Sequence, residues 1–213
     1  MCGGNKDTEC SSKNFLFSNA ASWRLYSPEN VNSKSVRVFY LVWRWFWTIL
    51  FTTFLVLSGA LPQTWYTDQS QRIKYFIYLT NWGYLTFCIA QIWNAATSTA
   101  GYFTQDMEVR WYMKINWFLY SLTSSPAVLI SLLFWALIYS SSYPLEPDTF
   151  FTHGINCLFT LLDIWLTAMP IKILHFYVPA SFAVVYVVFS VIYDYSNGTN
   201  ALLRPYIYSV NSN

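Results

Sequence analysis

Apolar residues gather into long blocks along this chain, and charged residues become scarce after residue 37. No Asp, Glu, Lys or Arg occurs from Ile115 to Leu145, a stretch longer than the ~20 residues that cross the hydrocarbon core of a bilayer. Five blocks of this kind are visible, at about residues 38–59, 73–97, 116–139, 149–171 and 173–193. The pattern predicts an all-α, polytopic transmembrane helix bundle with five visible spans.

The two ends of the chain have a different composition. Residues 1–37 are rich in Ser, Asn, Lys and Gly, with too few apolar residues to offset the entropy cost of ordering. We therefore expect a mobile polar arm there, a transmembrane bundle over residues 38–193 and a polar tail over residues 194–213.

Composition narrows the class of protein. Hydrophobic residues make up 55% of the chain and charged residues 10%, and the net charge is only +2. A soluble protein of this length would carry more charge, and a nucleic-acid-binding protein would carry a strong basic patch. The sequence has no CxxC, HExxH, GxGxxG or P-loop motif, so it predicts no metal ion, cofactor or nucleic acid. The lipid bilayer is the partner that it does predict.

Basic residues predict the orientation in the membrane. Six of them near span ends fall on the side of the amino terminus, and three fall on the other side. The six are Arg24, Lys34, Arg37, Arg110, Lys114 and Lys172, and the three are Arg72, Lys74 and Arg204. Positive charge favours the cytoplasmic side, so we expect a cytoplasmic amino terminus and an extracytoplasmic tail. The triplet Asn197-Gly198-Thr199 would then lie outside, as an N-glycosylation site close to span five or as a chance match.

Two of the expected helices carry polar stripes. At ~100° per residue, each set falls within a sector of about 80°. The stripe of the second span contains Thr80, Tyr84, Gln91 and Asn94, and that of the fourth contains His153, Asn156, Thr160, Asp163 and Thr167. Polar residues within a membrane usually face the interior of the bundle or a water-filled cavity.

The depth of each polar residue within the membrane suggests which members of the two stripes could meet. At ~1.5 Å per residue, Thr80 and His153 both lie roughly 6 to 10 Å below the outer ends of their spans. A histidine beside a threonine hydroxyl can take its proton as the oxygen attacks an ester carbonyl, and Asn156 could orient the ring or donate to an oxyanion. The alternative is that Thr80, His153 and Asn156 form ordinary interhelical hydrogen bonds.

An ion pair is possible nearer the inner side. Arg44 and Asp163 lie about 9 and 12 Å from the inner ends of spans one and four, so they could pair and fix how these helices pack. Alternatively, the long Arg44 side chain could reach the cytoplasmic interface instead.

Several segments resemble the rolling stone family of animal multi-pass membrane proteins. They are Tyr78-Leu79-Thr80-Asn81-Trp82-Gly83-Tyr84, His153-Gly154-Ile155-Asn156, Gly198-Thr199 and Pro205-Tyr206-Ile207-Tyr208. The resemblance covers roughly residues 20–210. It implies a plasma-membrane protein, since the founding member is linked to myoblast fusion in muscle development. Members continue into a further hydrophobic span, so the resemblance also implies that a final span is lacking here.

The rolling stone family is in turn distantly similar to the androgen-induced and androgen-dependent TFPI-regulating membrane hydrolases, which cleave fatty acid esters of hydroxy fatty acids. Their threonine follows an aromatic-Leu pair, as Thr80 follows Tyr78-Leu79, and their histidine opens a later span, as His153 does. Asn81 and Trp82 depart from the hydrolase pattern. Two functions therefore stay open: a fusion or adhesion protein that acts through membrane protein partners, and a Thr/His hydrolase with a lipid ester substrate. A transporter is disfavoured because no internal repeat is visible.

Overall fold

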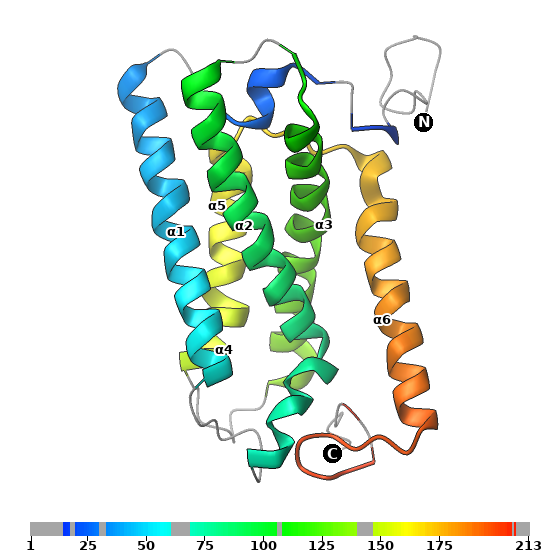
Figure 1. Cartoon of the computed structure of the whole chain (residues 1–213). Coiled ribbons are helices and arrows are strands. Elements are labelled where there is room, and N and C mark those ends of the chain that lie inside the picture. Colours follow the sequence, from blue (N-terminus) through cyan, green and yellow to red (C-terminus); the bar gives the residue numbers. More distant parts are fainter. Residues whose placement is uncertain are drawn as a thin grey trace.

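Long helices run side by side in the computed structural model and alternate in direction along the chain (Figure 1). The structure describes residues 15–17, 20–29, 33–60, 69–105, 108–139, 147–205 and 207. The α-helices are α1 (Lys34–Ala60), α2 (Leu79–Thr104), α3 (Trp111–Leu133), α4 (Pro147–Phe150), α5 (Asn156–Leu166) and α6 (Tyr177–Tyr195). These described residues form no β-strand, so the all-helical class is confirmed.

Shorter segments with a different hydrogen-bond spacing join these helices. Three are 3₁₀-helices, η2 (Ser22–Leu25), η3 (Gln69–Ile77) and η6 (Ile173–Phe176), and two are π-helical, η4 (Phe134–Ile138) and η5 (Phe151–Ile155). The π-helical segments widen the helix locally where α3 ends and where α5 begins.

Among the residues that the structure describes, three segments are long and apolar enough to cross a membrane, namely Lys34–Gly59, Trp111–Leu137 and Ile173–Tyr195. The helical run Phe151–Leu166 is apolar but shorter. Helix α2 is long, yet it buries polar side chains such as Gln91, Asn94 and Thr97, which lower its apolarity. Three spans of the five that the sequence predicts are thus supported by length and composition.

The boundaries of two expected spans shift in the structure. The sequence predicted a helix over residues 73–97, whereas η3 occupies its beginning and α2 continues to Thr104. The extended backbone of Tyr78, with φ −92° and ψ 131°, separates the two. The fourth expected span, residues 149–171, also ends earlier than expected. Helix α5 ends at Leu166 because the backbone of Thr167 is extended, with φ −87° and ψ 145°.

Part of the expected mobile arm packs onto the bundle. The side chain of Leu25 is fully buried, and its carbonyl accepts a hydrogen bond from Asn116 Nδ2 at 2.9 Å. The backbone N–H of Ala168 donates to the carbonyl of Ser27 at 3.1 Å. Residues 20–29 are therefore part of the folded structure, because backbone and side-chain partners far along the chain order them.

We name residues 20–29 the strap. The strap closes on α2 at a glycine, since a Cβ added at Gly101 would lie 2.2 Å from Cγ of Tyr26. Only a residue without a side chain allows this approach. The strap lies at the end of the bundle where α1 begins and α2 ends (Figure 1). Residues 1–14 of the expected arm lie outside the described part of the chain.

The tail folds back onto η3 at the opposite end of the bundle (Figure 1). Lys74 Nζ donates to Thr199 Oγ1 at 2.6 Å and to the carbonyl of Asn200 at 3.0 Å, and the N–H of Ala201 donates to Tyr78 Oη at 3.3 Å. Asn197 of the glycosylation triplet is exposed in this turn, with a positive φ of 58°.

In the described part of the chain, two clusters of buried residues form the core. The first lies between α1, α2 and α5 and contains Phe51, Tyr84, Phe87, Cys88 and Phe159. The second joins the strap to α3 and to the segment after α5, and contains Leu25, Met113, Trp117, Tyr120 and Met169. The rings of the first cluster lie mostly edge to face, the arrangement that aromatic side chains prefer.

Candidate functional site

The candidate site begins at the junction of η3 and α2, which the block Tyr78–Tyr84 forms. Asn81 Nδ2 donates to the carbonyl of Tyr75 at 2.7 Å, and Trp82 Nε1 donates to the carbonyl of Phe76 at 2.6 Å. These carbonyls belong to η3, so the two side chains hold the chain where it changes from 3₁₀ to α geometry. Asn81 and Trp82 thus position the first turn of α2, which carries Thr80.

The next two residues of the block set the distance from α2 to its neighbours. A Cβ at Gly83 would lie 3.1 Å from Cδ1 of Ile130, so α2 passes close to α3 here. Tyr84 points the other way and donates from its hydroxyl to the carbonyl of Phe51 in α1 at 3.2 Å. The block therefore locks α2 between α1 and α3.

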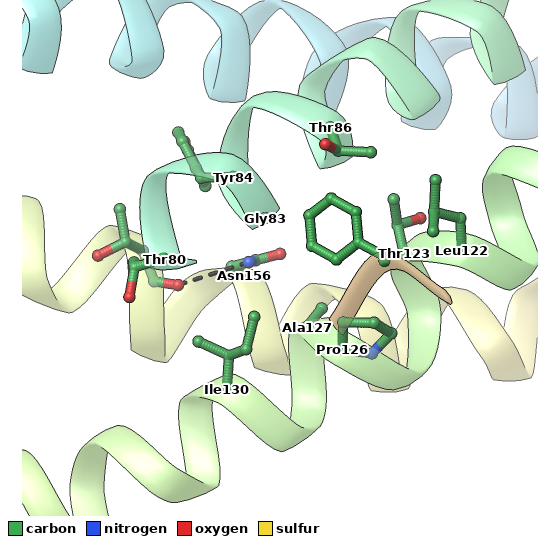
Figure 2. Close-up of a pocket in the computed structure, with 12 residues that line it drawn as sticks. Thr80, Gly83, Tyr84, Thr86, Leu122, Thr123, Pro126, Ala127, Ile130 and Asn156 are labelled. Atoms are coloured by element: carbon green, nitrogen blue, oxygen red, sulfur yellow. Dashed lines mark hydrogen bonds between the residues drawn. The ribbon is translucent and has the colours of Figure 1, made fainter. Parts of the chain in front are cut away.

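A small pocket opens where α2 faces α3 and η5 (Figure 2). Threonine hydroxyls and an amide form its polar side, and apolar groups of α3 and α6 close it. The polar members are Thr80, Thr86, Thr123, Thr152 and Asn156. The space that water can occupy there is about 20 Å³, which suffices for about one water molecule. We call it the Thr80 pocket.

Asn156 brings a buried hydrogen-bond acceptor to the Thr80 pocket. Its Nδ2 donates to the carbonyl of Thr152 at 3.4 Å, the interaction drawn in Figure 2. Its Oδ1 is buried and has no hydrogen-bond partner among the described residues. A buried amide oxygen without a donor is costly, and a water molecule or a ligand with a hydroxyl group would satisfy it.

His153 takes a different position. Its ring stacks on that of Phe134 in η4, with centroids 3.7 Å apart and planes 4° from parallel. It is buried, and within the described part of the chain its Nδ1 has no hydrogen-bond partner. The structure thus brings Thr80 and Asn156 to one pocket and places the ring of His153 against η4, outside the residues that line that pocket.

Arg44 and Asp163 lie together in the interior. Arg44 Nη1 is 2.7 Å from Asp163 Oδ1, and the two side chains are 0% and 2% exposed. Arg44 Nη2 also donates to Tyr40 Oη, which lies 3.0 Å from Thr167 Oγ1. The result is a buried chain of polar groups that links α1 to the end of α5.

Sequence reasoning missed Tyr40 as a member of this group, although a signal was present. Tyr40 stands four residues before Arg44, and Thr167 stands four residues after Asp163. Residues four apart in a helix share a face, so Tyr40 could have been assigned to the same interface as Arg44.

The whole sequence also matches a known family. A family model described as "Protein rolling stone" matches residues 2–213. The chain belongs to the rolling stone family. It is 26% identical to "Protein rolling stone" of Drosophila melanogaster over 221 residues, which cover 97% of this chain and 77% of that relative. No solved structure matches the chain.

Membership confirms the resemblance that the sequence motifs indicate. In this rolling stone family member, the Tyr78–Tyr84 block has a clear structural role at the start of α2. The same block exposes Thr80 to a pocket, so structural and chemical roles for this block are compatible.

Proposed function

We propose that this rolling stone family member is a multi-pass protein of the plasma membrane that acts in cell fusion, such as the fusion of myoblasts. The observation that carries the proposal is the family match over nearly the whole chain. The outer surface supports the membrane setting, since large apolar side chains point away from the bundle. Examples are Phe39, Phe46, Ile49, Val184 and Trp165, which is 84% exposed.

Five crossings with a cytoplasmic amino terminus form part of this proposal. The polar stripe of α2 is buried in the bundle, so its polarity is compatible with a position inside the membrane. The strap and the tail lie at opposite ends of the bundle (Figure 1), which requires an odd number of crossings. We propose α2 and Phe151–Leu166 as the two crossings beyond those supported by length and apolarity.

One cell experiment tests both parts. In muscle precursor cells that lack this protein, we expect fewer nuclei per fused cell, and rescue by the full chain carrying Asn197→Cys. A membrane-impermeant maleimide should label this variant in intact cells, because Asn197 is exposed and lies outside in the proposed orientation. The unmodified chain is the control, since Cys2 and Cys10 would then be cytoplasmic, Cys88 is buried and Cys157 lies within the proposed crossing Phe151–Leu166. Normal fusion without the protein would contradict the role, and labelling only after permeabilisation would contradict the orientation.

A second candidate function is hydrolysis of a lipid ester. It is favoured by the presence of Thr80 and Asn156 in one pocket, where Asn156 Oδ1 has no partner among the described residues. In such a reaction Thr80 Oγ1 forms a bond to the ester carbonyl carbon, the alcohol leaves with a proton, and water then releases the fatty acid from the threonine. His153 could act as the base only after its ring leaves Phe134, and the pocket would have to widen for an acyl chain.

Labelling by a fluorophosphonate probe tests this candidate. If the hydrolase function holds, the purified protein reacts with the probe, and Thr80→Ala and His153→Ala each lower labelling at least tenfold. Thr104→Ala at the exposed end of α2 is a matched control that should label as the wild type does. All variants must first elute as folded species. A folded wild type that the probe does not label would rule out a reactive threonine and leave Thr80 as a packing residue.

A further inference from the structure

A second and larger cavity lies at the other end of α2. It is enclosed by the strap, by the first turns of α1 and by the last turns of α2. The space that water can occupy there is about 240 Å³, an order of magnitude more than in the Thr80 pocket. We call it the strap cavity.

The walls of the strap cavity combine one cation with aromatic rings and neutral polar groups. The rings are those of Trp23, Tyr26, Tyr40 and Tyr102, the neutral polar side chains are Ser27, Ser98 and Gln105, and the cation is Arg37. Among the described residues, no acidic side chain lines the cavity. Its charge is therefore positive, and its neutral groups can donate hydrogen bonds.

Arg37 is the residue that points to a ligand. Its Nε is shielded from solvent and has no hydrogen-bond partner among the residues that the structure describes. Arg44, two turns further along α1, has Asp163 as its ion-pair partner. A shielded guanidinium nitrogen without an acceptor is unfavourable, and a phosphate or carboxylate that binds in a bidentate way would satisfy it.

The position of the strap cavity at the membrane surface indicates which kind of anion would bind Arg37. Arg37 lies three residues after Lys34, where the membrane-crossing segment of α1 begins, or ~4.5 Å along the helix axis. Phosphate groups of lipids lie at this level, and rings such as those of Trp23 and Tyr102 are typical of it. A lipid headgroup is already concentrated there, whereas a free anion would have to come from bulk water.

We propose that the strap cavity binds the headgroup of a phospholipid with net negative charge, with Arg37 on the phosphate. This inference uses the membrane crossing of α1 and does not depend on the fusion or hydrolase function. In the proposed orientation the cavity faces the cytoplasmic leaflet, which is rich in anionic lipid.

Binding of short-chain lipids to the purified full chain in a neutral detergent tests the proposal. We expect short-chain phosphatidylserine to bind the wild type, and Arg37→Gln to weaken this binding about tenfold, as for the loss of one charge-assisted hydrogen bond. Arg37→Lys should fall between the two, because lysine keeps the charge but loses the planar fork. Lys34→Gln is the matched control, since it removes the same charge from the same end of α1 at an exposed side chain outside the cavity lining, and it should change binding less than twofold.

Further arms separate the possible sources of the anion. Phosphatidylcholine of the same chain length should bind at least tenfold more weakly, and millimolar inorganic phosphate should not displace phosphatidylserine. Equal binding of wild type and Arg37→Gln would overturn the proposal, as would equal losses in Arg37→Gln and Lys34→Gln, which would indicate diffuse surface charge. Displacement by inorganic phosphate would show a free-anion site and would also overturn it. Each variant is compared at equal thermal stability, so that a folding defect is not mistaken for lost binding.

Discussion

Replacing Asp163 by asparagine is expected to destabilise the protein by about 3–5 kcal/mol, the cost of leaving one member of a buried ion pair without its partner. Arg44 is 0% exposed and has Asp163 Oδ1 at 2.7 Å, so its charge would remain in the interior with the neutral hydroxyl of Tyr40 as an acceptor. Reversible unfolding of the purified protein in mixed detergent micelles measures the change in free energy.

A double-mutant cycle decides whether the two residues act as a pair. Arg44→Gln alone should also destabilise the protein, but in the Asp163→Asn background it should add little or even restore stability, because the unpaired charge is removed. Asp194→Asn is the control, since this carboxylate is exposed at the end of α6 and its loss should change stability by less than ~0.5 kcal/mol. Additive losses in the double variant would show that Arg44 and Asp163 do not depend on each other.

Replacing Leu25 by alanine is expected to produce the second large effect, a loss of about 2–5 kcal/mol with release of the strap. Leu25 is 0% exposed and packs with Met113, Trp117 and Met169. Its truncation would leave a cavity between the strap and α3, and the strap would lose its buried side chain. Unfolding as above measures the stability, and limited proteolysis reports cleavage within residues 20–29.

Leu16 provides the matched control for this experiment. It precedes the strap, and its side chain is 64% exposed, so Leu16→Ala should leave both stability and proteolysis unchanged. If Leu25→Ala were cleaved no faster than the wild type and were equally stable, the packing of the strap would not contribute to the fold.

The helical class could be predicted from the sequence because the bilayer imposes a simple rule on composition and length. The long uncharged run that contains most of α3 and the scarcity of charge after residue 37 suffice for this conclusion. The strap could not be predicted in the same way. Its order depends on Asn116 and Ala168, which lie far along the chain and carry no signal in the residues of the strap itself.

The expected pairing of Thr80 with His153 rests on regular helix geometry, which does not hold at His153. Depth could be predicted from the rise per residue, but direction around the helix axis requires a constant rotation per residue. His153 lies in the π-helical segment Phe151–Ile155, whose wider turn breaks this regularity. Asn156, the first residue of α5 after that segment, lines the Thr80 pocket, whereas the ring of His153 lies against Phe134.

Because the strap contacts α2 at Gly101, its packing can be disturbed by a substitution at this one position. The strap and α2 fit only because position 101 lacks a side chain. A methyl carbon there would lie 2.2 Å from Cγ of Tyr26 and would force the two segments apart. Gly101→Ala would therefore act on the strap and the last turns of α2, whereas Arg44 and Asp163 pair directly between α1 and α5. This one substitution thus tests the contribution of the packed strap separately from that of the helix bundle.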